Sequence, residues 1–122
     1  DFDLFVQMMR LAWNLDVKGI RQWTEQVSKL TRDGQVRFLQ KAQKMIRENF
    51  ILRLNNRQLT YMNRAEMEFA SKFARFIHEK NVVLIMEELA LAEAQIAQNG
   101  NVKIILFHLE ILLYKLLKKP RQ

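Results

Sequence analysis

The sequence predicts an all-α fold, a compact bundle of about six helices. Apolar residues recur at steps of three and four in six segments, and no segment alternates as a strand does. The 122 residues include only three glycines and one proline. Because these two residue types interrupt helices and build hairpin turns, their scarcity favours long helices. The length suits a single helical domain over residues 1–122, with a core that needs no cross-links.

The first two helices are separated by a polar residue suited to helix capping. The first is expected from Phe2 to Asn14. Asp16 then precedes the second, and its carboxylate can accept hydrogen bonds from the free amides of that helix's first turn. The apolar residues expected to line the buried face of the second helix are Val17, Ile20, Trp23, Val27 and Leu30.

The third helix is expected from Gln35 to Leu54, after a short break at residues 31–34 that contains Gly34. A looser polar stretch follows over residues 55–62, anchored by Leu59 and Tyr61.

Asn63, with Glu66 three residues later, has the spacing of a capping box and predicts the start of a fourth helix. The buried face of this helix is expected to comprise Phe69, Ala70, Phe73, Phe76 and Ile77. Asn81 is expected to cap a fifth helix that runs to about Gln98.

Residues 99–101 predict a tight turn between the fifth and sixth helices. Gly100 is expected to adopt the left-handed conformation that ends one helix, and Asn101 to cap the next.

The sixth helix, from Val102 to Leu117, has two apolar faces separated by polar residues. Lys103 and Glu110 mark one polar stripe, and His108 and Lys115 mark the other. The broad face comprises Ile105, Leu106, Leu109, Leu112, Leu113, Leu116 and Leu117. The narrow face comprises Ile104, Phe107, Ile111 and Tyr114.

A helix at the edge of its own domain needs one apolar face, so a second face indicates a second neighbour. A central helix wrapped entirely by its own domain has apolar residues all round and is the alternative. The position of this helix at the end of the chain favours a partner. We therefore expect the narrow face to form part of a subunit interface.

No arrangement of residues indicates a catalytic site, a metal site or a cofactor site. The chain has no cysteine and only two histidines, His78 and His108, which fall on different helices. His78 is expected at a helix end, where a cation would meet the negative end of the helix dipole. The glycines are isolated, so no phosphate-binding loop is present to bind ATP. We expect no enzymatic activity and no small-molecule substrate for this chain. A helical enzyme or ligand-binding domain is the weaker alternative, and it would need His108, Glu110 and another titratable residue in one buried cluster.

The sequence also predicts no membrane span. The most apolar segment is the sixth helix, which carries four polar residues and is shorter than the ~20 residues that cross a bilayer. The lack of cysteine favours an intracellular, cytoplasmic location. The chain begins at Asp1 without an initiator methionine, and we expect it to be a piece of a longer protein or a processed product.

A row of cations on the third helix allows a different function. Arg37, Lys41 and Lys44 repeat at helical spacing opposite the apolar face, in a chain with a formal net charge of +7. Phosphate groups of a nucleic acid bind to such rows. Glu48 lies in the same row, and a solvated helix face has the same pattern. Nucleic-acid contact therefore stays open as an alternative.

The order of several motifs resembles a known family. Met45-Ile46-Arg47-Glu48-Asn49-Phe50 is followed by Tyr61, by a segment from Phe69 to Ile77, and by Asn81-Val82. Gln98-Asn99-Gly100-Asn101 then precedes an apolar helix. In this order the chain resembles the C-terminal domain of bacterial DNA polymerase III clamp-loader subunits of the delta-prime or gamma-like type. The resemblance extends over nearly all 122 residues.

The resemblance implies a helical oligomerisation domain, called the collar, that follows an ATPase-like module. Collar domains of sister subunits join in a ring, in a machine that places the sliding clamp on primer-template DNA. The implied partners are other clamp-loader subunits, with DNA contact through the parent complex, the DNA polymerase III holoenzyme. The nucleotide-binding motifs of that family have no counterpart here, as expected of a chain that begins after the ATPase module.

Overall fold

The computed structural model describes residues 1–54 and 63–120. These residues form six α-helices and one short 3₁₀ helix, and no strand occurs among them. The predicted all-α bundle is therefore confirmed. The elements are α1 (Phe2–Asn14), α2 (Val17–Ser28), α3 (Arg32–Leu54), α4 (Arg64–Phe73), η1 (Ala74–Phe76), α5 (Val82–Ala97) and α6 (Val102–Leu117). The loose stretch expected over residues 55–62 lies outside the described residues.

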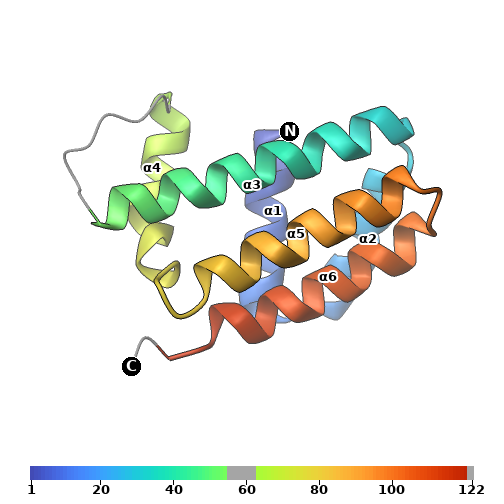
Figure 1. Ribbon diagram of the computed structural model, residues 1–122. Coiled ribbons are helices and arrows are strands. Elements are labelled where there is room, and N and C mark those ends of the chain that lie inside the picture. The colour runs from blue at the N-terminus through green and yellow to red at the C-terminus, as the bar shows by residue number, and fades with distance from the viewer. Residues whose placement is uncertain (55–62, 121–122) are drawn as a thin grey trace.

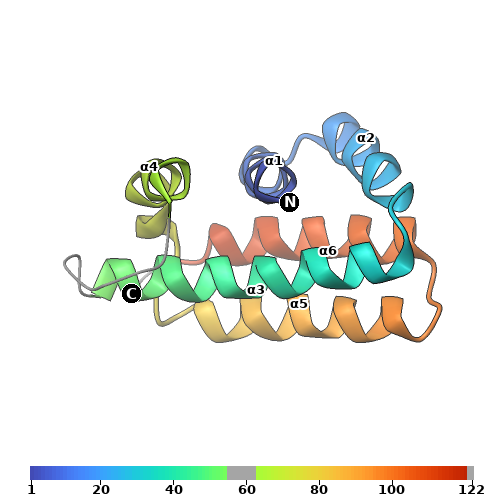
Figure 2. The same ribbon diagram turned by 90° about the horizontal axis from the view of Figure 1, so that it is seen from above.

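The three longest helices run side by side, with α5 in contact with both α3 and α6 (Figure 1). The helices α1, α2 and α4 all lie on one side of this layer (Figure 2). Both α1 and α2 pack against α6, which also contacts α5, so α6 has neighbours on both sides of the bundle. This position explains why it needs apolar residues over most of its circumference.

One continuous core connects residues of all six α-helices. Trp23 on α2 lies at its centre, and its indole nitrogen donates a hydrogen bond to the carbonyl oxygen of Leu4, at 3.0 Å. Most apolar residues at helical spacing are buried as expected. Val17 and Leu30, at the two ends of the second predicted stripe, are instead exposed, and Leu30 lies beyond the end of α2 at Ser28.

Local capping residues explain where several helices begin. The side chain of Asp16 accepts a hydrogen bond from the amide of Gly19, at 2.9 Å, as predicted. Asn63 and Glu66 form the expected capping box, with reciprocal hydrogen bonds of 2.9 Å. The predicted break at residues 31–34 is wrong. The hydroxyl of Thr31 accepts from the amide of Gly34, at 3.0 Å, so α3 already begins at Arg32.

The segment between α4 and α5 is held by two buried polar side chains, and their roles differ from those expected. Asn81 precedes α5, but its side chain does not cap that helix. Its amide nitrogen donates to the carbonyl oxygens of Phe76 and Leu116, at 2.9 and 3.0 Å, and its oxygen accepts from the amide of His78, at 2.9 Å. Asn81 therefore links the start of α5 to the end of α6.

His78 is buried after the end of η1, and its ring nitrogens contact backbone groups instead of making the charge interaction with a helix dipole that the sequence suggested. Its Nδ1 accepts from the amide of Lys80, at 3.2 Å, and its Nε2 lies 3.1 Å from the carbonyl oxygen of Lys119. Because Nδ1 accepts a hydrogen bond, Nε2 is the ring nitrogen that can donate to Lys119. His78 thus ties the end of α6 to the segment before α5.

The turn between α5 and α6 uses a different residue for the left-handed position than expected. Asn99 has the positive φ, 67°, whereas Gly100 does not. The amides of Asn99 and Gly100 donate to the carbonyl oxygens of Ile96 and Gln95, which is the hydrogen-bond pattern of a Schellman motif. Asn101 caps α6 as predicted, accepting from the amide of Ile104 at 3.1 Å.

Glycine is needed at position 100 because of close packing. A Cβ atom there would lie 2.6 Å from Cδ1 of Ile105 and 2.8 Å from the backbone oxygen of Gln95. We expect Gly100→Ala to lower the free energy of unfolding by about 2 kcal/mol, because the backbone of α5 must shift. Gly34→Ala, with its nearest contact at 3.2 Å to a side chain, should stay within about 1 kcal/mol of the parent protein. Urea unfolding measures both, and equal effects would contradict the packing explanation.

Candidate partner interface

The two apolar faces predicted for α6 are covered to different extents. Leu106, Leu109, Leu113 and Leu117 of the broad face are buried, and its other members are half-buried. Ile104 of the narrow face is 68% exposed. Phe107, Ile111 and Tyr114 are half-buried. The domain thus covers the broad face and leaves the narrow face incompletely covered.

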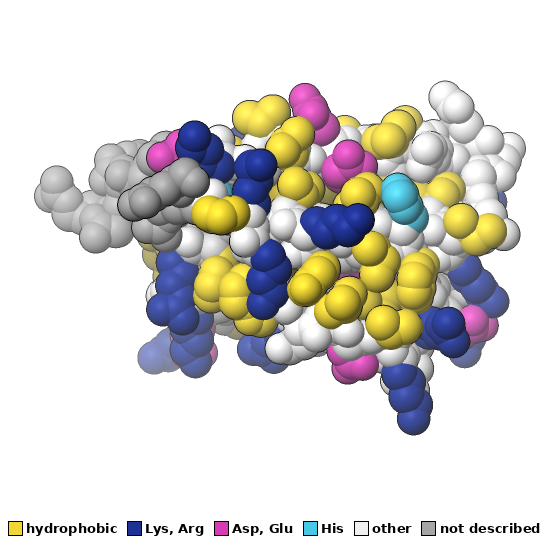
Figure 3. Space-filling view, turned by 90° about the horizontal axis from the view of Figure 1, so that it is seen from below, with side chains coloured by type: hydrophobic (Ala, Val, Ile, Leu, Met, Phe, Trp, Pro, Cys, Tyr) yellow, Lys and Arg dark blue, Asp and Glu magenta, His cyan; other side chains and the backbone are white. Residues whose placement is uncertain are grey.

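A groove between α2 and α6 contains most of the narrow face. Its volume is about 560 Å³, and its floor on the α6 side comprises Ile104, Phe107 and Ile111. Tyr114, one turn further along, is not among the lining residues. Figure 3 shows hydrophobic side chains gathered on the face of the molecule seen from below, interspersed with basic side chains. We call the groove between these two helices the α2–α6 groove.

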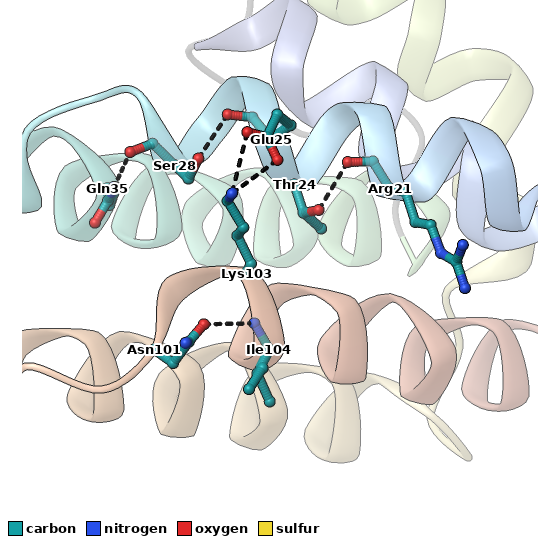
Figure 4. A network of polar contacts seen from close by, with 8 residues as sticks. All are labelled: Arg21, Thr24, Glu25, Ser28, Gln35, Asn101, Lys103 and Ile104. Carbon is teal, nitrogen blue, oxygen red and sulfur yellow. Dashed lines mark hydrogen bonds and ion pairs between the residues drawn. The ribbon is translucent and has the colours of Figure 1, made fainter.

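Three residues of α2 form the opposite wall of the groove, and none of them was singled out from the sequence. They are Arg21, Thr24 and Glu25. The hydroxyl of Thr24 donates to the carbonyl oxygen of Arg21, at 2.9 Å, which satisfies its polar group within α2 (Figure 4). The helical periodicity of α2 gave no signal for these residues, because only the packing of α2 on α6 makes them neighbours of the narrow face.

An ion pair closes one end of the groove. Nζ of Lys103 on α6 lies 2.9 and 3.0 Å from the two carboxylate oxygens of Glu25 on α2 (Figure 4). The hydrogen bond and charge of Lys103 lower the pKa of Glu25, so this carboxylate stays ionised. The side chain of Arg21 points away from this pair (Figure 4). Among the described residues, no carboxylate lies within ion-pair distance of Arg21.

Glu110 does not lie on the polar surface that its spacing from Lys103 predicted. It is 0% exposed, and neither carboxylate oxygen has a hydrogen-bond partner among the described residues. Burial raises the pKa of Glu110 to about 9, so the side chain is neutral at pH 7. Glu110 lies seven residues after Lys103, about 10 Å further along α6. Lys103 is exposed to solvent, whereas the rest of the domain covers Glu110.

The histidine and the glutamate of α6 are not brought together. His108 is exposed at the groove, whereas Glu110 lies in the interior. No group of three or more histidine, aspartate or glutamate side chains within residues 1–54 and 63–120 is arranged to hold a metal ion.

The basic row on α3 is exposed as predicted, but two of its three cations already have acidic neighbours. Nζ of Lys41 lies 3.3 Å from the carboxylate of Asp1, and Nζ of Lys44 lies 3.9 Å from that of Glu48. Arg37 is exposed without such a neighbour in the described part of the chain. The row therefore offers a weaker positive charge than the sequence suggests.

A second exposed apolar surface lies on α5. Val83 and Leu91 are 60% and 51% exposed, and Leu84 is 40% exposed. Glu87 and Glu88 belong to the same side of the helix. Periodicity identified the buried side of α5 correctly and gave no reason to single out these three residues.

The described fold is thus a helical bundle with an incompletely covered apolar groove. Searches against protein-family models, curated proteins and solved structures find nothing that matches the chain. Within the residues described, every helix is too short or too polar to cross a lipid bilayer.

Proposed function

We propose that this chain is an oligomerisation domain, and that the narrow face of α6 is part of its subunit interface. The observation that supports this most is the 68% exposure of Ile104 beside half-buried Phe107 and Ile111. An exposed apolar side chain beside half-buried ones in a groove is a surface that a partner can cover. Covering it would stabilise an assembly by ~25 cal/mol for each Å² of apolar surface, before the costs of association.

The assembly we propose is the collar of a bacterial sliding-clamp loader, with sister subunits as partners. Support comes from the resemblance in motif order and from an all-α bundle with a two-faced terminal helix. A ring member needs two different contact surfaces, because head-to-tail contacts generate closed rings. In this proposal the domain works in the cytoplasm, carries no catalytic residues itself, and reaches DNA only through the parent complex.

Ile104→Asp tests the proposed interface with little risk to the fold, because this side chain is mostly in solvent. We expect the variant to lose the stoichiometric complex with co-expressed clamp-loader subunits in size-exclusion chromatography. The physical reason is that a carboxylate in a covered apolar contact is desolvated without a partner. The unfolding midpoint in urea should stay close to that of the parent protein.

Met67→Asp is the matched control, since Met67 is an exposed apolar residue on α4, away from the groove. It should leave the complex intact. A complex that withstands Ile104→Asp as well as Met67→Asp would rule out the narrow face as the interface.

A nucleic-acid module that uses the basic row is the second candidate. All three of its cations are exposed on one side of α3. Binding of duplex DNA through Arg37, Lys41 and Lys44 should weaken about tenfold or more between 50 and 200 mM salt, because each phosphate contact releases counterions. Changing all three residues to glutamine should abolish it. Fluorescence anisotropy with labelled DNA measures this, and no binding at low salt would eliminate the candidate.

A further inference from the structure

Three charged residues line the α2–α6 groove: Arg21 and Glu25 on α2 and Lys103 on α6. Glu25 and Lys103 pair with each other, and among the described residues no carboxylate lies within ion-pair distance of Arg21. Exposed Lys115 follows Ile111 by one turn of α6, beyond the lining residues, and the only acidic residue of this helix, Glu110, is buried and unavailable to a partner. The groove is therefore apolar at its floor, and Arg21 at its border is a cation that no carboxylate neutralises.

We propose, building on the interface proposed above, that the α2–α6 groove binds an acidic amphipathic helix of a neighbouring subunit. A helix places apolar side chains at i, i+3 and i+4 into a groove between two helices. Carboxylates along the edges of that helix would meet Arg21 and Lys115, where basic side chains would be repelled. The bound helix would cover Ile104, Phe107 and Ile111.

This chain carries a helix of the required chemistry on a different surface. The helix α5 contains Glu87, Glu88 and Glu93 and no lysine or arginine. Its exposed side combines Leu84 and Leu91 with the first two of these glutamates. A neighbouring subunit of the same design would thus present an acidic helix to the groove, in a head-to-tail contact.

Two labelled helical peptides test the inference on the folded domain. Both have leucines along one face, and the flanking positions are glutamate in one peptide and lysine in the other. We expect the glutamate peptide to bind at least about tenfold more tightly in 50 mM salt, with a smaller difference at 500 mM salt. Fluorescence anisotropy measures both affinities.

Variants of the domain locate the binding site. Arg21→Glu should weaken binding of the glutamate peptide about tenfold, and Ile104→Asp should abolish it. Arg37→Glu changes the net charge equally but lies on α3, so it should weaken binding less than about twofold. Equal binding of the two peptides, no binding of either, or equal effects of Arg21→Glu and Arg37→Glu would overturn the inference. If Ile104→Asp nevertheless disrupts the complex with sister subunits, the groove remains the proposed subunit interface, and only the acidic character of its partner is rejected.

Discussion

Replacing Glu110 with leucine should raise the free energy of unfolding at pH 7 by about 3 kcal/mol. Burial raises the pKa of Glu110 in the folded protein to about 9, from an ordinary value of 4.5. At pH 7 the unfolded chain gains the free energy of ionising this carboxyl group, and the folded chain does not. Leucine is similar in size and removes that difference, as well as the two unpartnered oxygens.

The same residue predicts how stability depends on pH. Between about pH 4.5 and pH 9 the folded state holds a proton on Glu110 that the unfolded state has lost. The contribution of Glu110 to the free energy of unfolding is therefore fully present below pH 4.5. It falls by about 1.4 kcal/mol per pH unit as the pH rises toward about 9. Urea unfolding at pH 5, 7 and 8.5 should show this slope in the parent protein and a flatter dependence in Glu110→Leu.

Glu87→Leu is the control for this experiment, because Glu87 is exposed on α5. Its effect should stay within about 0.5 kcal/mol, with the pH dependence of the parent protein retained. If Glu110→Leu kept the full slope, the pH dependence would have to come from another group and the carboxyl of Glu110 would not be buried as described.

Asn81→Ala should lower the free energy of unfolding by about 3 kcal/mol. Its side chain is 0% exposed and makes hydrogen bonds to the backbone of His78, Phe76 and Leu116. Alanine fills less space and removes all three bonds, and buried polar groups without partners are costly. The same substitution also separates the end of α6 from the start of α5, so amide hydrogen exchange should rise in both segments.

Asn101→Ala provides a matched comparison, since Asn101 is exposed and makes a single capping bond to Ile104. Its loss should cost about 1 kcal/mol, the usual value for a helix cap. If chemical denaturation gave equal losses for the two variants, Asn81 would be acting as a local cap and the link to α6 would contribute nothing.

Helix positions were largely predictable because they depend on contacts between residues close in sequence. Asp16, Asn63 and Asn101 cap α2, α4 and α6 through bonds to residues three positions away. The expected break before α3 failed for a related reason. A glycine in the first turn of a helix is compatible with a cap at Thr31, so the segment that contains Gly34 is the start of α3 and not a break before it.

The candidate interface was predictable only in part. The spacing of Ile104, Phe107 and Ile111 identified a second apolar face, and this face does lie at a groove. The wall supplied by Arg21, Thr24 and Glu25 was not predictable, because those residues lie some eighty positions earlier in the chain. The partner itself stays a proposal.

The helical class, most helix boundaries and the two faces of α6 follow from the order of residues, since hydrogen bonds and side-chain periodicity within a helix are local properties. Packing between distant helices determines that Glu110 is buried, that Asn81 bonds to α6 instead of capping its own helix, and that Ile104 is exposed. These outcomes depend on which distant helices cover a given side of α6, and spacing along one helix carries no information about that cover.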